Sequence, residues 1–438
     1  MAAAISLRSY LLVTALSKSR RTITLSFRDI DLEHTWDIDH LPWDAFNHPS
    51  RKKRYYDLVT GLDQELVEAM QQYVADVSKD APAAEQRMHQ TTASAFLYLF
   101  LSLGSQQSPA CIYTLRSTIP IGAGLGSSAS IFVCLATALL IQSRALSGPH
   151  PDQLPEEATK QIERINRWAF VGEMLIHGNP SGVDNTVASG GKAVLFKRED
   201  YSQPPVVKSL PTFPELPLLL VDTRQPKSTA AEVAKVALFK EMQPIIANHI
   251  LDAIDNVTES AHTLISAPDF DSKDVESLTK LGELASINHG LLVSLGVSHP
   301  RLERLRQLID VAGIGWTKLT GAGGGGCAFA ILKPDIQTLT GEEQPLAQSK
   351  PSRKNALHQL EKELEAEGFE KYETTLGGDG VGVLWPAVLY NGSDEAGGDE
   401  IDQEKFIAAE GREGVERLVG VTGGAHGVMR ENWKFWRA

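Results

Sequence analysis

The residues best suited to chemistry begin with a glycine-rich segment at 120–130, which reads Pro-Ile-Gly-Ala-Gly-Leu-Gly-Ser-Ser-Ala-Ser. Alternating glycines allow backbone amides to close around a phosphate, and the helix expected next points its positive N-terminal dipole at the same anion. The hydroxyls of Ser127 and Ser128 can donate to phosphate oxygens or bind Mg²⁺. The alternative is a turn whose serines only cap the helix. No Gly-Lys-Ser/Thr ends the segment, so it is not a Walker loop.

A second glycine-rich segment, residues 321–326, reads Gly-Ala-Gly-Gly-Gly-Gly and formally satisfies the G-x-G-x-x-G string of dinucleotide sites. A strand rather than a helix is expected after it, and no βαβ unit surrounds it, which disfavours the dinucleotide interpretation. We expect a turn that closes over a bound ligand. A flexible surface loop is the alternative.

Two carboxylates flank a third segment. Glu173 falls near the end of a predicted helix, and Asp184 follows the turn-forming residues Asn-Pro-Ser-Gly at 179–182. Near a polyphosphate, one carboxylate can hold Mg²⁺ while the other orients or deprotonates an attacking hydroxyl. Taken singly, each acid is more often a solvated or capping residue. His177 is expected to be a hydrogen-bonded structural residue rather than a metal ligand.

The elements that must position these segments fall into two groups. Residues 5–15 and 22–27, joined by the polar stretch 17–21, predict a β-hairpin. A strand at 111–115 leads into the first glycine segment, and an apolar helix follows that segment. The other expected elements are helices at 62–76, 86–103, 156–176, 230–265, 274–294, 299–312 and around Leu360, and strands at 193–196, 218–221, 327–332 and 372–384. Helices packed on a sheet in each half predict an α+β protein.

Composition divides the chain further. A proline-rich stretch at 204–217 marks a boundary between an N-terminal lobe, residues 1–210, and a C-terminal lobe, residues 211–388. Residues 389–438 are acidic and rich in glycine, which predicts a linker and a tail whose role the sequence does not indicate.

The overall composition excludes several classes of protein. The 438 residues include 42 Lys and Arg against 55 Asp and Glu, a net charge of −13, which argues against a nucleic-acid or anionic-membrane binder. No stretch reaches the roughly 20 apolar residues of a membrane span. Three cysteines without metal-ligand spacing favour a reducing cytosol. Residues 1–28 are basic and lack acids, as in a mitochondrial transit peptide, but we favour the hairpin.

In their order along the chain, 120–130, 173–185 and 321–326, the three segments resemble those of the GHMP small-molecule kinases. The middle segment, 176–185, is similar to that of the mevalonate kinases, one branch of that family. The resemblance covers about residues 2–386, and further similarities lie at 95–102, 226–229, 318–326 and 375–378. It implies a two-lobed α+β fold. The N-terminal lobe would have a mixed sheet with helices, and the C-terminal lobe would have helices on an antiparallel, ferredoxin-like sheet.

The resemblance also implies roles for individual residues. Glu173 and Ser128 would hold Mg²⁺, and Asp184 would be the base or orienter for the substrate hydroxyl. Substrate contacts fall to Thr229 and Gly323. Contacts to ATP fall to Ser117, Gly122, Ala123, Gly124, Leu125, Gly126, Ser127 and Ser128. Asp29 stands where relatives often carry a nucleotide-contacting asparagine.

The implied activity is phosphorylation of the 5-hydroxyl of mevalonate by ATP, giving 5-phosphomevalonate and ADP for isoprenoid and sterol synthesis. The implied protein is a cytoplasmic homodimer, inhibited by prenyl diphosphates that compete with ATP, with no nucleic-acid or membrane partner. Relatives begin with Pro-Gly-Lys and Gly-Glu-His, and this sequence starts after that segment, so we expect a longer natural protein. The alternatives are phosphomevalonate kinase, another GHMP kinase, or a catalytically dead nucleotide or metabolite sensor.

Overall fold

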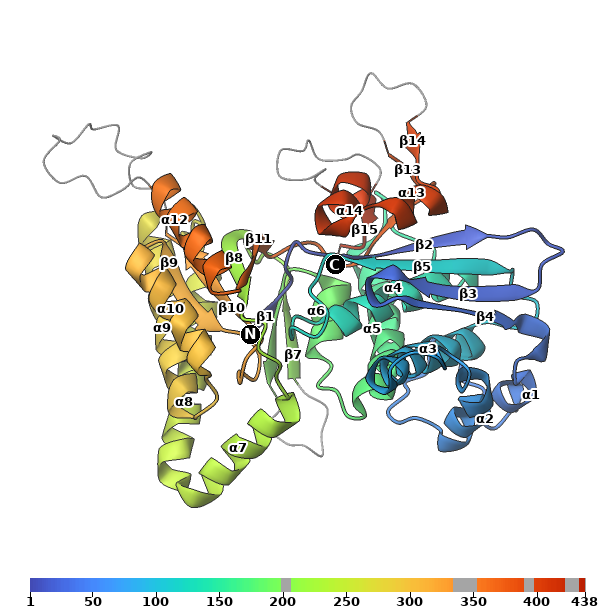
Figure 1. Cartoon of the computed structure of the whole chain (residues 1–438), viewed down its shortest axis with the longest axis horizontal. Coiled ribbons are helices and arrows are strands. Elements are labelled where there is room, and N and C mark those ends of the chain that lie inside the picture. Colours follow the sequence, from blue (N-terminus) through green and yellow to red (C-terminus); the bar gives the residue numbers. More distant parts are fainter. Residues whose placement is uncertain (198–205, 334–352, 390–397, 422–432, 438) are drawn as a thin grey trace, which may run out of the picture.

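The computed structural model describes residues 1–197, 206–333, 353–389, 398–421 and 433–437. Two lobes lie side by side (Figure 1), the earlier part of the chain forming one and the yellow and orange helices forming the other. Helices and sheets occur in both lobes, so the predicted α+β class is confirmed.

The N-terminal lobe is built on a four-stranded mixed sheet. Its strand order is β2 (Ser9–Ala15), β5 (Cys111–Ser117), β3 (Thr22–Phe27) and β4 (Leu32–Asp37). Short helical turns follow β3 and β4, and helices complete the lobe: η1 (Arg28–Ile30), η2 (Ile38–His40), α1 (Trp43–Asn47), α2 (Gln64–Val74), α3 (Ala83–Leu103), α4 (Ser127–Gln142), α5 (Pro155–His177) and α6 (Val183–Gly190).

Local sequence explains the helices that cover this sheet. In α2, Leu66, Met70 and Val74 recur every four residues and are all buried, which gives the helix one apolar face. The Asp63 side chain accepts hydrogen bonds from the first free amides of α2 and caps it. Helix α3 ends in an apolar run that is buried on every side, because it packs beneath the sheet against α5.

The predicted β-hairpin is wrong, although both of its strands exist. Strands β2 and β3 are not paired with each other, because β5 lies between them. It pairs antiparallel with β2 and parallel with β3. A polar connection at 17–21 is long enough to cross over one intervening strand, since neighbouring strands are only about 4.8 Å apart. Turn composition alone therefore could not specify the partner.

The C-terminal lobe carries helices against an antiparallel sheet. The order of that sheet is β11 (Glu370–Leu376), β8 (Leu216–Asp222), β10 (Cys327–Leu332) and β9 (Gly315–Leu319). Its helices are α7 (Thr229–Met242), α8 (Pro244–Ile265), α9 (Val275–Ser294), α10 (Pro300–Ala312) and α12 (Arg353–Ala366). A small sheet of β1 (Ala2–Ala3), β6 (Ala193–Lys197) and β7 (Val206–Leu210) lies between the lobes.

The last part of the chain packs on the N-terminal lobe above β2 (Figure 1). We call residues 398–421 and 433–437 the C-terminal segment. It contains β14 (Asp399–Glu400), α13 (Gln403–Ala408), α14 (Gly411–Val419) and β15 (Trp433–Phe435). Strand β14 pairs with β13 (Val388–Leu389), and β15 pairs with β12 (Gly382–Leu384). Trp436 is only 1% exposed and joins the core of the N-terminal lobe.

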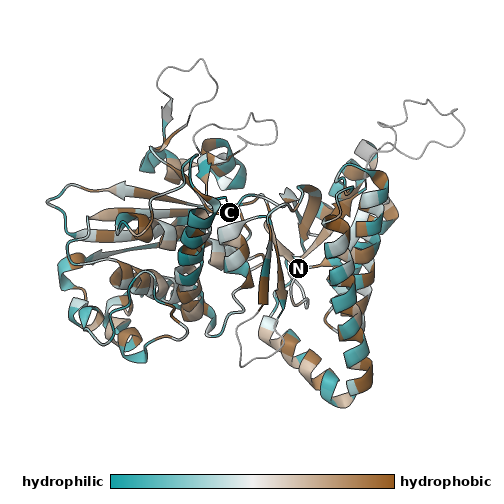
Figure 2. Ribbon diagram, turned by 180° about the vertical axis from the view of Figure 1, so that it is seen from behind, coloured by the Kyte–Doolittle hydropathy of each residue, from teal (hydrophilic) through white to brown (hydrophobic). Residues whose placement is uncertain are grey.

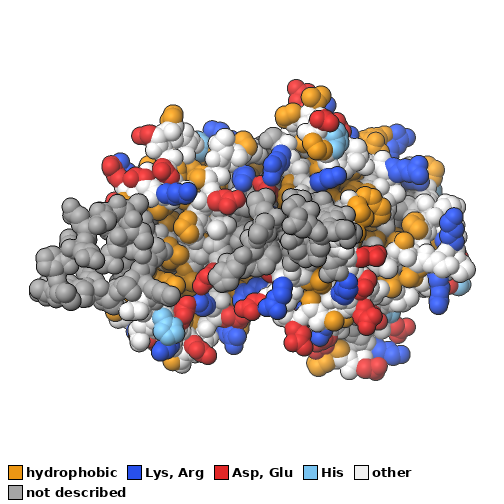
Figure 3. Space-filling model, turned by 90° about the horizontal axis from the view of Figure 1, so that it is seen from above, with side chains coloured by type: hydrophobic (Ala, Val, Ile, Leu, Met, Phe, Trp, Pro, Cys, Tyr) orange, Lys and Arg blue, Asp and Glu red, His pale blue; other side chains and the backbone are white. Residues whose placement is uncertain are grey.

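The apolar residues are concentrated on the inner strands of both lobes, with hydrophilic positions on the outer helix faces (Figure 2). Seen from above, acidic and basic side chains are interspersed, with hydrophobic side chains scattered among them (Figure 3). Among the described residues, no helix combines the length and the apolar character that crossing a membrane requires. Residues 341–352, expected as a loop, lie outside the described residues.

Candidate active site

The first glycine-rich segment connects β5 to α4 and faces the junction of the lobes. Gly122, Gly124 and Gly126 all have left-handed backbone angles, with φ of +77°, +75° and +72°. Side chains at these positions would strain the backbone, which explains the glycines. Left-handed residues at alternate positions can turn successive amides to one side and form an anion-binding concavity. Gly126 also caps α4 without a side-chain hydrogen bond, so the first amides of the helix are available to a ligand.

The two predicted carboxylates approach this loop from different helices. Asp184 is the second residue of α6, and a side chain at Gly126 would place its Cβ 3.2 Å from the Cβ of Asp184. Glu173 lies inside α5 and is 4% exposed. His177, at the end of α5, connects Glu173 to the start of α4, because its Nε2 lies 3.4 Å from the Ser128 hydroxyl and 3.9 Å from Glu173 Oε2. The structure thus brings Ser128, Glu173 and Asp184 to one side of the loop.

Burial dominates the electrostatics of these acids. Desolvation raises the pKa of Glu173 to about 7; the Ser128 hydroxyl opposes this rise, and the nearby charge of Asp184 adds to it. Asp184 is solvent-accessible, but desolvation by the surrounding protein also raises its pKa, and the charges of His177 and Lys227 oppose that rise. Both carboxyls therefore gain from a nearby positive charge.

A divalent cation fits this arrangement. Glu173 Oε1 and the Ser127 hydroxyl are buried, and neither has a hydrogen-bond partner among the described residues. A buried carboxylate oxygen without a donor is costly unless a ligand satisfies it. No group of three or more His, Cys, Asp or Glu side chains in the described ranges could hold a metal. Mg²⁺ would therefore need phosphate oxygens and water beside Ser128 and Glu173, which is its usual preference.

Lys227 is a site residue that the sequence reasoning did not select. A side chain at Gly124 would collide with its Nζ, and one at Gly321 would place its Cβ 3.4 Å from the same atom. Burial lowers the pKa of Lys227, and the charges of Asp184 and Asp222 oppose that change. The lysine thus lies between both glycine-rich segments and beside Asp184. Its position in the Pro-Lys-Ser-Thr sequence, just before Thr229, was the available signal.

The second glycine-rich segment forms the turn between β9 and β10. Its residues Gly321, Gly323, Gly324, Gly325 and Gly326 all have positive φ. A side chain at Gly326 would approach Ala123 O to 2.9 Å, so the two glycine segments face each other. The expected turn is confirmed.

The two predicted substrate residues have neighbours other than the carboxylates among the described contacts. Gly323 packs against the backbone of Val297, and a side chain there would overlap the Val297 carbonyl. Thr229 is exposed at the start of α7, one residue after Ser228, which caps that helix. No contact of Thr229 with the glycine loop or with either carboxylate appears among the described interactions, and both assignments stay predictions.

Ser117 and Asp29 lie where β5 enters the glycine segment. The Asp29 carboxylate accepts a 2.7 Å hydrogen bond from the backbone amide of Ser117. The Ser117 hydroxyl donates to the carbonyl of Ile119 at 3.1 Å and lies 3.1 Å from the Ser9 hydroxyl. Asp29 therefore holds the backbone that leads to the loop.

A cavity of about 1420 Å³ opens beside these groups, between the lobes. Its lining includes the polar residues Asp184 and Lys318 and the glycine-loop residue Gly124. It also includes the apolar residues Val133 and Ile141 of α4. The cavity can therefore accept a ligand with a charged head and an apolar extension.

Comparison with known proteins accounts for this geometry. The GHMP kinase N-terminal domain matches residues 90–191, and the GHMP kinase C-terminal domain matches residues 269–366. A mevalonate kinase of Aspergillus fumigatus is 65% identical over 439 residues, covering 100% of this chain and 78% of the relative. The chain belongs to the mevalonate kinase family.

More distant mevalonate kinases are similar too. The human mevalonate kinase is 34% identical, with 87% of this chain and 89% of the relative covered. The crystal structure of Leishmania major mevalonate kinase in complex with R-mevalonate superimposes with a TM-score of 0.52 at 25% identity, over 69% of this chain and 81% of that one. The Methanococcus jannaschii mevalonate kinase, at 19% identity and a TM-score of 0.55 over 85% and 90%, shares the fold.

Proposed function

We propose that this chain transfers the γ-phosphoryl group of ATP to the 5-hydroxyl of mevalonate, giving 5-phosphomevalonate and ADP. The observation that carries the proposal is the contact of Asp184 with Gly126, which puts a solvent-accessible carboxylate beside a loop shaped to bind phosphates. An enzyme of phosphoryl transfer supplies mainly positioning and charge neutralisation, and both are provided here.

Nucleotide binding would use the backbone amides of Gly122 to Ser128 and the start of α4. Ser128 and Glu173 would hold Mg²⁺, which when bound would neutralise charge on the phosphates. The unpartnered Glu173 Oε1 supports this assignment. Ser117 would face the nucleotide from the end of β5.

Asp184 would receive the proton of the substrate hydroxyl. As the hydroxyl oxygen bonds to the γ-phosphorus, its proton passes to the Asp184 carboxylate, and the bond between the γ-phosphorus and the bridging oxygen breaks to release ADP. The desolvation that raises the Asp184 pKa makes its carboxylate a better proton acceptor. Lys227, between the loops, would stabilise charge on the transferred group.

Comparative turnover tests this proposal. ADP release should depend on mevalonate and stay at background with phosphomevalonate as the acceptor. Turnover of phosphomevalonate but not mevalonate would reassign the substrate, and release with neither acceptor despite ATP binding would support a nucleotide sensor.

Inhibition by prenyl diphosphates is supported by the polar and apolar residues that line the cavity. The diphosphate would occupy the glycine loop, and the chain would extend along the apolar α4 side past Val133 and Ile141. Geranyl diphosphate should raise the apparent KM for ATP without lowering the maximal rate, whereas geraniol, without the diphosphate, should not. Inhibition that excess ATP fails to relieve would contradict this arrangement.

A homodimer is supported by exposed apolar residues around the α7–α8 junction. Leu238, Met242, Ile245 and Ile246 are 53–73% exposed and lie within nine residues of chain. Light scattering should give twice the chain mass for the wild type and half that value for Leu238→Glu/Ile245→Glu. A wild-type monomer would contradict the proposal.

A cytoplasmic location accords with three free cysteines, Cys111, Cys134 and Cys327, and fractionation of expressing cells tests it.

A further inference from the structure

We propose that the C-terminal segment positions the nucleotide-binding loop, with Arg116 and Glu416 as the positioning residues that connect the two. The proposal gives a role to residues that the proposed phosphoryl transfer does not use. It rests on the proposed binding of ATP at the glycine loop.

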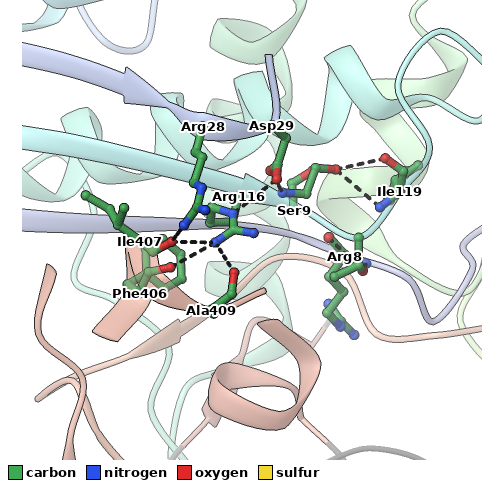
Figure 4. Close-up of polar contacts among 11 residues, drawn as sticks. Arg8, Ser9, Arg28, Asp29, Arg116, Ile119, Phe406, Ile407 and Ala409 are labelled. Atoms are coloured by element: carbon green, nitrogen blue, oxygen red, sulfur yellow. Dashed lines mark hydrogen bonds and ion pairs between the residues drawn. The ribbon is translucent and has the colours of Figure 1, made fainter. Parts of the chain in front are cut away.

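The argument begins with Arg116, a guanidinium that is 3% exposed on β5. Its Nη1 donates hydrogen bonds to three carbonyls at the end of α13: Phe406 at 3.0 Å, Ile407 at 3.3 Å and Ala409 at 2.8 Å. Its Nε donates to Asp29 at 3.1 Å. Figure 4 shows Arg116 between Asp29 on one side and the three carbonyls on the other.

Asp29 carries this connection to the loop. The same carboxylate that pairs with Arg116 accepts the amide of Ser117, and the Ser117 hydroxyl braces Ile119, three residues before Gly122. Because a buried charge must keep its partners, moving the end of α13 would force Arg116, and with it Asp29, to rearrange.

A second connection comes from α14. Glu416 accepts hydrogen bonds from the Thr118 hydroxyl at 2.9 Å and from the Tyr10 hydroxyl at 3.1 Å. Burial raises the pKa of Glu416, and these hydrogen bonds together with Arg8 and Arg412 oppose that rise. Thr118 follows Ser117 directly, so the C-terminal segment holds the residues on both sides of the one expected to face the nucleotide.

Strand geometry explains why β5 can contact the C-terminal segment on one face and α4 on the other. Successive side chains of a strand point to opposite faces of its sheet. Arg116 and its cross-strand neighbour Tyr10 face the C-terminal segment. Ser117 and its neighbour Ser9 face α4, where the Ser9 hydroxyl lies 2.6 Å from that of Ser130. The end of β5 is therefore held between the C-terminal segment and the helix that follows the glycine loop.

The far end of the C-terminal segment is also anchored. The indole Nε1 of Trp436 donates a 2.9 Å hydrogen bond to Gln161 on α5, the helix that carries Glu173. β15 pairs with β12 just before it. The segment is thus fixed at α13, at α14 and at Trp436.

The first test uses Glu416 in the full chain. Glu416→Ala should raise the Kd of a non-hydrolysable ATP analogue and the KM for ATP about tenfold, with the KM for mevalonate changed less than twofold. Glu416→Gln keeps acceptor oxygen for Thr118 and should recover part of the loss. Glu413→Ala, an exposed position on the same helix, is the matched control and should behave as wild type.

The second test uses linkage on the unmodified protein. If docking of the segment favours nucleotide binding, nucleotide binding must favour docking by the same factor. Hydrogen exchange of the amides in α13 and α14 should slow when the ATP analogue is added. This measurement applies even if an Arg116 or Glu416 variant fails to fold.

The outcomes separate the two proposals. If the wild type binds no ATP analogue, the proposed function fails. If it binds the analogue, but exchange in α13 and α14 is unchanged and Glu416→Ala binds it normally, the positioning role fails and the proposed function stands. An equal rise in the KM for both substrates would mean that Glu416 only maintains the fold.

Discussion

The two glycine-rich loops have similar composition but use their glycines differently. In the loop before α4, alternate glycines take left-handed angles, and the amides between them remain available to an anion. In the turn between β9 and β10, the glycines leave room for neighbours, since added side chains would overlap Val297, Glu232 and Gln225. One loop presents its backbone to a ligand, and the other lets backbone and side chains pass close to it.

The loops also differ in the charges beside them. Asp184 lies against Gly126 of the first loop, while Lys227 lies between Gly124 of the first loop and Gly321 of the second. The comparison teaches that glycine spacing identifies a loop but not its task. The element that follows, a helix or a strand, and the charged neighbours decide the task.

The largest effect is expected at Asp184, which contacts Gly126 of the first loop. Asp184→Asn keeps the shape of the side chain but removes its ability to accept the hydroxyl proton, so kcat should fall by about 10³–10⁴. Binding of the ATP analogue should persist. Steady-state kinetics and calorimetry measure the two quantities, with exposed Asp152→Asn as control. A residual kcat within tenfold of wild type would contradict the role of Asp184.

Lys227 tests whether the two loops act as one site. Lys227→Met removes the charge that lies between them, so kcat should fall by about 10²–10³, in line with the loss of one preorganised donor. Lys227→Arg should restore part of that rate. Lys240→Met, at an exposed position on α7, the helix that follows Lys227, serves as control. If Lys227→Met lost only protein stability and kept its kcat, the lysine would belong to the scaffold.

Alanine at one glycine of each loop breaks the comparison directly. Gly323→Ala should lower the free energy of unfolding by about 2–5 kcal/mol, from left-handed strain plus overlap with Val297. Gly124→Ala, which would meet Lys227 instead, should mainly weaken nucleotide binding.

Denaturant titration and analogue binding measure these two effects, and Gly290→Ala on α9, where nothing lies within 4 Å, is the control. The comparison would be mistaken if Gly323→Ala weakened nucleotide binding at full stability while Gly124→Ala only destabilised the fold.

The smallest effect is expected from the pH dependence of stability that Glu173 causes. Because the pKa of Glu173 is about 7 in the fold against 4.5 in the unfolded chain, the folded state binds more protons between these values. Stability without metal should therefore fall as pH rises from about 4.5 to 7, by at most about 3 kcal/mol. Glu173→Gln should reduce this slope, with the part due to Asp184 and Glu416 remaining, while Glu163→Gln on the same helix should keep it in full. Unfolding curves at several pH values decide the matter, and an unchanged slope in Glu173→Gln would refute the assignment.

Sequence reasoning worked where the signal was local. The strand, glycine loop and helix around Gly122 to Ser128 follow one another in the chain, and the turn at 179–182 returns Asp184 toward that loop. Lys227 was missed because its Pro-Lys-Ser-Thr sequence does not show which loops the lysine side chain will contact. Only the fold brings it to two loops that lie about a hundred residues away on either side.

The packing of the C-terminal segment could not be predicted for a different reason. Acidic residues and glycines dominate its composition, yet a few apolar side chains, Phe406, Val415, Val419 and Trp436, are nearly fully buried. Helical content there depends on contacts with β2 and Arg116, far away in sequence, rather than on local propensity. Long-range partners of this kind also explain the wrong pairing of β2 with β3.

The place of β5 in the N-terminal sheet has a consequence for how the protein is made. Ninety residues separate the end of β3 at Phe27 from the end of β5 at Ser117, and at about 5–20 residues per second a ribosome needs roughly 5–18 s to add them. During that interval β2 and β3 lack the strand that joins them and expose their edges. The nascent chain is therefore most vulnerable to aggregation, and most in need of chaperones, before residue 117 emerges.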